Sequence, residues 1–237
     1  MSSVSILSRR AFVLGAAGAL AGCATAGTEP KNVPVPRRVS YPIAPASDAE
    51  LEARYAAVQD GGHLIPAIPF REMDPKHFRQ RVKDPTGEPA GTVVVDAPNR
   101  FLYLVEPGGT AMRYGVGLGR EGFAWGGEGI IHWRQPWPRW KPPADMIARQ
   151  PSLERYSVEN GGMEPGIRNP LGARALYIFQ DGKDTLYRLH GTPEWKSIGK
   201  AVTSGCVRLL NQDVIDLYKR VPYHARIVVY QKPTLSV

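Results

Sequence analysis

The sequence predicts a mainly β domain with a few helices, preceded by a flexible region that is partly helical. The chain of 237 residues contains 22 prolines and 25 glycines, and this abundance favours short strands and turns over long helices. Short apolar runs separated by turn residues recur between residues 92 and 230, which is the pattern of β-strands. Apolar residues make up 43% of the chain, enough for a real core. We therefore expect one domain of ordinary size with an N-terminal appendage.

Residues 1–22 have the features of an export signal rather than of a folded element. Arg9 and Arg10 fit the pattern of twin-arginine signals. The apolar stretch that follows, residues 11–21, is too short to span a bilayer comfortably. The sequence therefore predicts export to the periplasm by the twin-arginine route.

The signal ends in Leu20-Ala21-Gly22-Cys23, which resembles the lipobox of bacterial lipoproteins. This resemblance implies cleavage before Cys23, acylation of that residue, and a membrane anchor of several acyl chains. Alanine follows the cysteine, which by the same resemblance favours the outer membrane. Cleavage near residues 24–26 without lipid is the alternative.

Residues 23–46 are rich in proline and poor in apolar residues, and we expect them to form a partly extended tether. Residues 47–90 are expected to form a helical and irregular extension. The spacing of Leu51, Tyr55 and Val58 predicts a helix over 48–59, capped by Asp48 and stopped at Gly61-Gly62. His63 and His77 lie in this extension, far from any nucleophile in sequence, and we expect structural or surface roles for both.

The third region, residues 91–232, is expected to be the main folded domain. Its strands are predicted over residues 92–96, 101–105, 111–117, 129–133, 175–180, 185–190 and 226–230. A short helix is predicted over 143–150, and a longer one over 212–221 with Asn211 as its N-cap. Gly-x-Gly patterns near Gly117 do not indicate nucleotide binding, because no βαβ unit accompanies them.

Three tryptophans, Trp133, Trp137 and Trp140, lie among prolines and basic residues. Exposed rings there would make a platform for sugar rings or a peptide, and rigid loop packing is the equally weighted alternative. His132 beside them is expected to be a core or surface residue. Lys and Arg outnumber Asp and Glu, which gives the chain a formal net charge of +8. This charge fits attraction to an anionic wall or membrane surface, and it also fits ordinary surface charge. No charge run indicates nucleic acid binding.

The strongest chemical signal runs from His190 to Arg208. Cys206 is one of only two cysteines, and the alternative to a free thiol is a disulfide with Cys23. If Cys23 carries lipid, Cys206 is a lone thiol in an oxidising compartment, which catalysis explains better than packing. The imidazole of His190 can generate its thiolate. The amides of Gly205 and Cys206 would then form an oxyanion hole.

This stretch closely resembles the signature of the L,D-transpeptidases, the YkuD-type or ErfK–YbiS-type cell-wall enzymes. The matching residues are His190-Gly191-Thr192, Gly199, and Thr203-Ser204-Gly205-Cys206-Val207-Arg208. The resemblance extends more loosely from about residue 91 to 230, and it implies a β-sandwich catalytic domain. Two positions depart from the family: Ser204 stands where many members carry histidine or arginine, and Thr203 replaces a commoner serine.

The resemblance implies that Cys206 attacks a peptidoglycan tetrapeptide stem at its third residue, releases D-alanine and passes the acyl group to an acceptor amine. His190 would transfer the proton, and the Gly191 carbonyl would orient its ring. Arg208, Thr192 and Ser204 would bind substrate, with a brace between Arg208 and Asp213 or Asp216 as the alternative role of the arginine. Carbapenems are the expected inhibitors. No cofactor or metal is expected.

The acceptor is left open between a stem amine, an amine of a wall-attached protein, a D-amino acid and water. Water as acceptor would make the chain an L,D-carboxypeptidase or endopeptidase, which shares the same motif. A non-enzymatic wall-binding lipoprotein is the remaining alternative, and the intact His190, Gly205, Cys206 and Arg208 argue against it.

Overall fold

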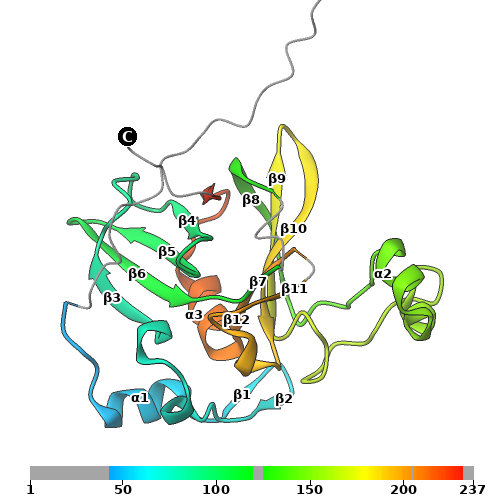
Figure 1. Ribbon diagram of the computed structural model, residues 1–237, viewed down its shortest axis with the longest axis horizontal. Helices are drawn as coiled ribbons and strands as arrows, with labels where there is room; N and C mark the ends of the chain where they lie inside the picture. The colour runs from blue at the N-terminus through cyan, green and yellow to red at the C-terminus, as the bar shows by residue number, and fades with distance from the viewer. Residues whose placement is uncertain (1–42, 120–124, 204, 232–237) are drawn as a thin grey trace, which may run out of the picture.

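The computed structural model describes residues 43–119, 125–203 and 205–231 (Figure 1). The expected signal peptide, Cys23, most of the tether and Ser204 lie outside the described residues. The described part is mainly β with a few helices, as predicted. No helix within it is long and apolar enough to cross a membrane.

One nine-stranded sheet forms the centre of the structure. In spatial order its strands are β12 (Val207–Leu210), β10 (Lys183–Thr192), β9 (Arg174–Gln180), β8 (Gly127–Pro136), β13 (Arg226–Tyr230), β4 (Val93–Asp96), β5 (Phe101–Glu106), β6 (Thr110–Gly115) and β3 (Gln80–Lys83). Neighbours are antiparallel except for two parallel pairs, β10 with β12 and β13 with β4. Two short strands, β7 (Leu118–Gly119) and β11 (Ala201–Thr203), pair separately.

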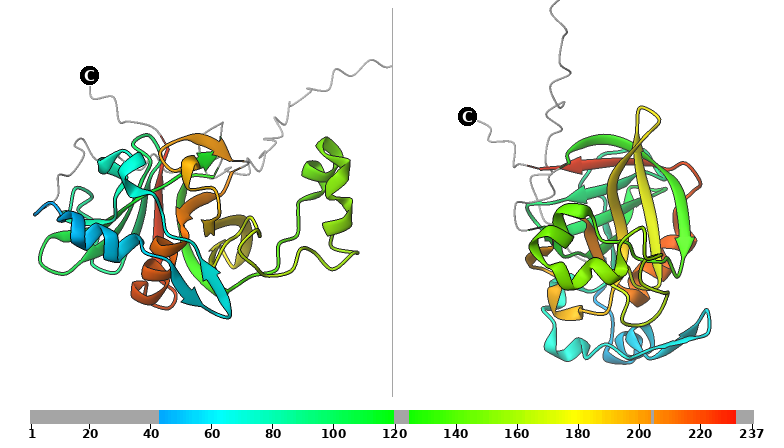
Figure 2. Two further views of the ribbon diagram at one scale, coloured as in Figure 1. Left: turned by 90° about the horizontal axis from the view of Figure 1, so that it is seen from below. Right: turned by 90° about the vertical axis from the view of Figure 1, so that its right-hand side faces the viewer.

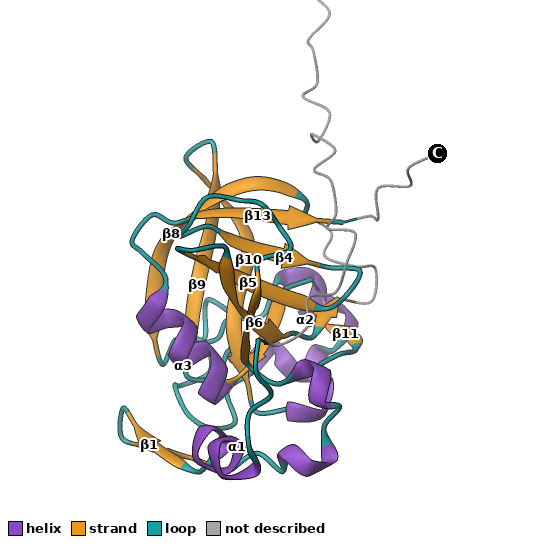
Figure 3. Cartoon of the chain, turned by 90° about the vertical axis from the view of Figure 1, so that its left-hand side faces the viewer, coloured by secondary structure: helices purple, strands orange, loops and turns teal. Residues whose placement is uncertain are grey.

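The sheet curves around its main core, so that strands from its two halves face each other. Val95 and Leu104 from one half lie in the same buried cluster as Leu189 and Val207 from the other. The helix α3 (Asn211–Arg220) adds Val214 and Leu217 to this cluster and covers it beside the sheet (Figure 3). The sandwich expected from the sequence is therefore formed by one folded sheet.

Most of the segment before β4 lies below the sheet in Figure 1, where Tyr55 and Phe70 pack with Leu210 in a separate buried cluster. The helix α1 (Asp48–Tyr55) is shorter than predicted, because Val58 already begins the hairpin of β1 (Val58–Asp60) and β2 (His63–Ile65). Its N-cap is Ser47, whose hydroxyl accepts from the Glu50 amide in a capping box, so the predicted cap at Asp48 was wrong by one residue. Two 3-10 turns follow, η1 (Phe70–Glu72) and η2 (Pro75–His77).

Residues 137–173, between β8 and β9, form an arm that projects from the sheet (Figure 2). The arm carries α2 (Ala144–Arg149), close to the helix predicted there, and the 3-10 helix η3 (Pro151–Tyr156). The three tryptophans do not form one platform. Trp137 is buried and donates its indole N–H to Asp60 at 2.8 Å, whereas Trp133 is exposed on β8.

Candidate active site

The two ends of the His190–Cys206 motif lie on neighbouring parallel strands. In the register of β10 with β12, Leu189 faces Val207 and His190 faces Arg208. Registered residues of neighbouring strands share a face of the sheet, so His190 and Arg208 are on the same side. Cys206 directly precedes β12, and its thiol forms a hydrogen bond with the backbone of Arg188, two residues before His190 on the neighbouring strand. Folding thus closes the sixteen-residue separation seen in the sequence.

His190 is almost fully buried, and its ring orientation is fixed from the backbone. Its Nδ1 lies 2.6 Å from the carbonyl oxygen of Gly191. A carbonyl can only accept, so Nδ1 carries the proton and the neutral ring keeps a lone pair on Nε2. Burial lowers the pKa of His190 to about 4. The hydrogen bond with the Gly191 carbonyl raises this pKa, the charges of Arg208 and Arg188 lower it further, and a hydrogen bond with the Pro170 backbone raises it. Near pH 7 the ring is a neutral base.

Cys206 is half-buried and is not part of a disulfide among the described residues. Burial raises its pKa, while the hydrogen bond with the Arg188 backbone and the charges of Arg188 and Arg208 act in the opposite direction. The resting pair is therefore a thiol and a neutral imidazole rather than a preformed ion pair. Such a pair can react when the imidazole takes the thiol proton during attack on a carbonyl.

Two buried asparagines hold the backbone that surrounds His190. Asn169 donates from Nδ2 to the carbonyls of Pro138 and Glu164, at 3.0 and 3.1 Å, and accepts from the Leu171 amide at 2.9 Å. These bonds fix the turn that carries Pro170. The Asn-Pro-Leu-Gly segment was visible in the sequence, but its link to His190 was not.

Asn211 is the second of these asparagines, and its predicted role as N-cap was wrong. Leu210 is the N-cap of α3, and the Asn211 Oδ1 accepts from the Ala173 amide at 2.9 Å instead. The side chain fits only because glycines face it: a Cβ added to Gly191 would lie 2.3 Å from Oδ1, and one added to Gly172 would lie 2.2 Å from it. Asn211 thereby fixes the position of the Gly191 backbone.

Arg208 pairs with Glu194, with Nη1 and Oε2 at 2.9 Å. The expected alternative partners, Asp213 and Asp216, face Arg79 instead. The Glu194 side chain is 70% exposed, so the pair is weakly held and a substrate carboxylate can replace it at little cost.

Thr192 and Gly205 were also predicted to belong to the site. Thr192 ends β10, is buried, and its Oγ1 accepts from the Glu194 amide at 3.1 Å. Gly205 has φ of +134°, and a Cβ there would meet the Tyr187 ring at 3.2 Å. Each of these residues therefore lies on or beside the two strands that carry the motif.

His63 and His132 have packing contacts away from the motif, whereas His77 packs against Gly199 within it. His63 packs on Trp137 with ring centroids 4.1 Å apart, and His132 packs on Phe179 at 4.9 Å. His77 is buried next to Phe101 at 5.7 Å. Within the described residues, no group of three histidine, cysteine or acidic side chains is arranged to hold a metal ion.

Comparison with known proteins assigns the family. A model of the YkuD family, described as the L,D-transpeptidase catalytic domain, matches residues 90–229, and the chain belongs to this family. The probable L,D-transpeptidase YbiS of Escherichia coli is 31% identical over 151 residues, 60% of this chain and 45% of that protein. The putative L,D-transpeptidase YkuD of Bacillus subtilis is 44% identical over 84 residues, 35% of this chain and 47% of that protein. The chain thus spans about half the length of the curated relatives it matches.

Among solved structures, a probable carnitine operon oxidoreductase from Brucella melitensis is 44% identical to this chain. The match covers 65% of this chain and 94% of that one, with a TM-score of 0.46. A TM-score of this size does not establish a common fold by itself, and the family assignment rests on the sequence match.

Proposed function

We propose that this chain is a peptidoglycan L,D-transpeptidase in which Cys206 is the nucleophile and His190 the proton carrier. The observation that carries the proposal is the buried, neutral His190 on the strand that faces Cys206, with its Nδ1 held by the Gly191 carbonyl. Family membership over residues 90–229 supports the same reaction class.

In the proposed reaction the sulfur of Cys206 attacks the carbonyl carbon of the third residue of a tetrapeptide stem. The thiol proton passes to Nε2 of His190 and then to the nitrogen of the leaving D-alanine. The resulting thioester is attacked by an acceptor amine, whose lost proton passes through His190 as the thiol is regenerated. The protein supplies position and proton transfer, and thioester formation and breakdown divide one difficult step into two.

The surrounding residues take supporting roles. The amides of Gly205 and Cys206 stabilise the oxyanion, and the positive φ of Gly205 is a conformation that favours glycine. Arg208 exchanges its exposed partner Glu194 for a carboxylate of the stem. Thr192 contributes to substrate binding, and we assign the same role to Ser204, which lies outside the described residues, from its place in the motif.

We further propose that the chain acts in the periplasm as a lipoprotein. In this organisation residues 1–22 are removed after twin-arginine export, Cys23 carries the lipid, 23–46 form the tether, 47–90 the extension and 91–232 the catalytic domain. Mass spectrometry of membrane-extracted protein should show an acylated N-terminal cysteine. A soluble form with an unmodified N-terminus would exclude the anchor.

The reaction is tested with purified muropeptides rich in tetrapeptide stems, followed by mass spectrometry of the products. Joined stems with loss of one D-alanine per donor are the expected result. Stems shortened by one residue without joining would identify water as the acceptor and make the enzyme an L,D-carboxypeptidase. Unchanged muropeptides, together with no joining of stems to a wall protein, would overturn the proposal.

A further inference from the structure

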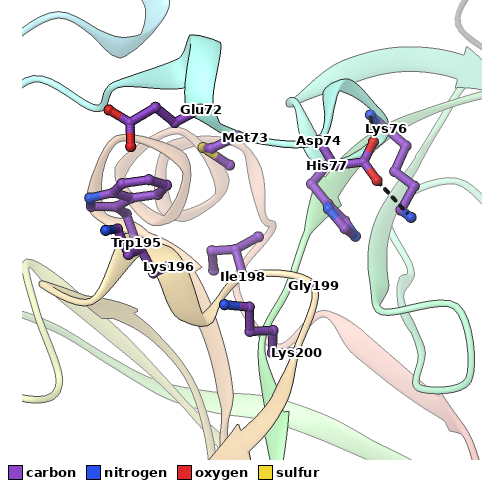
Figure 4. Close-up of a pocket in the computed structure, with 10 residues that line it drawn as sticks. All are labelled: Glu72, Met73, Asp74, Lys76, His77, Trp195, Lys196, Ile198, Gly199 and Lys200. Carbon is purple, nitrogen blue, oxygen red and sulfur yellow. Dashed lines mark hydrogen bonds and ion pairs between the residues drawn. The ribbon is translucent and has the colours of Figure 1, made fainter.

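A cleft of about 410 Å³ lies between the N-terminal extension and the segment that connects His190 to Cys206 (Figure 4). One wall comes from η1 and η2 and includes Glu72 and Met73. The other comes from η4 (Trp195–Ser197) and the residues that follow it, up to Lys200. Neither wall contains a residue of the proposed catalytic machinery.

The two walls carry opposite charges. Glu72 projects from the extension, and Lys196 and Lys200 project from the opposite wall (Figure 4). Among the described residues, no side chain forms an ion pair or hydrogen bond with Glu72, Lys196 or Lys200. The Nζ of Lys196 lies over the Trp195 ring, 5.3 Å from its centroid. The other charged lining residues, Asp74 and Lys76, pair with each other at 2.7 Å. The unpaired charges are therefore available to a ligand.

Apolar groups separate these charges. Trp195, Ile198 and Met73 line the cleft between Glu72 and Lys200 (Figure 4). Gly199 has φ of +78° and lies against the buried His77 ring, which a Cβ there would meet at 2.3 Å. This close packing fixes the position of the Lys200 backbone relative to the extension.

We propose that this cleft binds a second peptidoglycan stem peptide, with its free amine at Glu72 and its carboxylates at Lys196 and Lys200. Along the cleft, an acid is followed by an apolar surface and then by lysines. A ligand whose opposite charges are separated by an aliphatic chain matches this order. A purely anionic polymer matches it less well, because Glu72 would face like charge. The identity of the peptide rests on the function proposed above, whereas the charge pattern does not.

One wall of the cleft belongs to the segment that leads to the nucleophile. The wall from Trp195 to Lys200 continues into β11 and then Cys206, and Glu194 beside Trp195 holds Arg208. A peptide held in the cleft therefore contacts the same segment that positions the nucleophile. Its first effect is to keep a second stem next to the enzyme while the first one reacts.

Binding is measured without turnover in the Cys206→Ala protein, by NMR of the Trp195 indole and the Gly199 amide. Titration with purified disaccharide tetrapeptide should shift both signals to saturation. Acetylating the free amine of the third stem residue should raise the Kd at these signals at least fivefold in protein that retains Glu72. In Glu72→Gln the same acetylation should have no further effect. Absence of shifts at Trp195 and Gly199 would overturn the inference.

Charge variants provide the second arm. Lys200→Glu should raise the Kd at the Trp195 signal at least fivefold, and Lys183→Glu, an exposed lysine in the β9–β10 hairpin, should leave it unchanged. Equal weakening by both variants would indicate general charge attraction and would contradict the site. If the Trp195 signal shifts but the wild-type protein neither joins nor trims stems, the cleft binds the peptide and the proposed function is wrong. If the wild-type protein turns over stems but the Trp195 signal does not shift, the proposed function is supported and the binding site in the cleft is wrong.

Discussion

At the scale of single residues, burial acts on both members of the proposed catalytic pair in ways that keep them neutral. It lowers the pKa of His190 to about 4 and raises that of Cys206. Both charged forms lose hydration, and no described carboxylate contacts the ring to compensate for it. A neutral thiol is oxidised more slowly than a thiolate, because the thiolate is the form that reacts with oxidants.

The first prediction concerns the nucleophile. Cys206→Ala should abolish joining and trimming of stems while the thermal unfolding curve stays close to that of the wild type, since the side chain is small and half-buried. Carbapenem treatment should give one adduct by intact-mass measurement in the wild type and none in the variant. An adduct that persists in the variant would mean that another residue is the nucleophile.

The second prediction follows from the low pKa of His190. An NMR titration of its ring should have its midpoint near pH 4 rather than near 6.5, and acylation by a carbapenem should lose rate only as pH falls toward that value. His190→Ala should slow acylation most near neutral pH and recover in part above pH ~9, where the thiol ionises unaided. A ring midpoint near 6.5 in the folded protein would contradict the neutral pair.

At the scale of elements, strands and motif were more predictable than the contacts that hold the motif. The strands around residues 93–105 and 175–190 follow from apolar alternation, a local property of the chain. The N-cap prediction for Asn211 failed because a tertiary acceptor role, toward the Ala173 amide, overrides the local capping preference. The sequence also could not reveal that β3, from the extension, completes the sheet beside β6. Both findings depend on pairings between residues far apart in sequence.

The third prediction tests the packing of Asn211 against glycine. Gly172 and Gly182 have similar φ, +61° and +74°. A Cβ on Gly172 would lie 2.2 Å from Asn211 Oδ1, whereas one on Gly182 would meet no atom of the described residues within 4 Å. Gly182→Ala should therefore cost only backbone strain, about 1 kcal/mol or slightly more, with activity kept. Gly172→Ala should cost clearly more and reduce kcat, as measured by urea unfolding and turnover. Equal effects of the two substitutions would show that strain alone matters at Gly172.

At the scale of the whole molecule, the extension is bound to the part of the domain that carries the site. Gln212 at the start of α3 donates to the Ala56 and Pro66 carbonyls, at 3.2 and 2.9 Å. Leu210, the last residue of β12, is buried in one cluster with Leu51 of α1. The strand that follows Cys206 is therefore supported from the extension, although the family match begins only at residue 90.

The fourth prediction concerns Arg79, which joins the extension to two acids of α3. Its Nη1 lies 3.2 Å from Asp216 Oδ1 and its Nε 3.6 Å from Asp213 Oδ1, and its side chain is 15% exposed. Arg79→Ala should lower the free energy of unfolding by roughly 3 to 5 kcal/mol, because it removes the cation beside the buried Asp213 and leaves Asp216 with Arg220 as its only arginine among the described residues. Arg71→Ala removes exposed pairs with Glu52 and Asp48 and should leave the free energy of unfolding close to that of the wild type. Similar losses in urea unfolding would show that the Arg79 contacts add nothing.

The last prediction separates the two acids by the sign of their pH dependence. Burial raises the pKa of Asp213 to about 7, the charges of Arg79 and Arg54 oppose this, and the charge of Asp216 adds to it. Among the described residues, neither Asp213 oxygen has a hydrogen-bond partner. For Asp216 burial acts the same way, but hydrogen bonds from Arg220 and Tyr114 and the charge of Arg79 lower its pKa overall. A raised carboxyl pKa gives stability that is present below about pH 4 and lost as pH rises through 7. A lowered one gives stability that is present above about pH 4 and lost in acid.

Asp213→Asn should therefore raise the Tm more at pH 8 than at pH 5, since it removes a buried charge that exists only at the higher pH. Asp216→Asn should lower the Tm at pH 8, because it breaks the pairs with Arg79 and Arg220, and the loss should shrink toward pH 3. Calorimetry of the three proteins across this range measures both trends. A fall in Tm for Asp213→Asn that grows with pH would show that Asp213 is a charged partner of Arg79, and that the extension is held by two ion pairs instead of one.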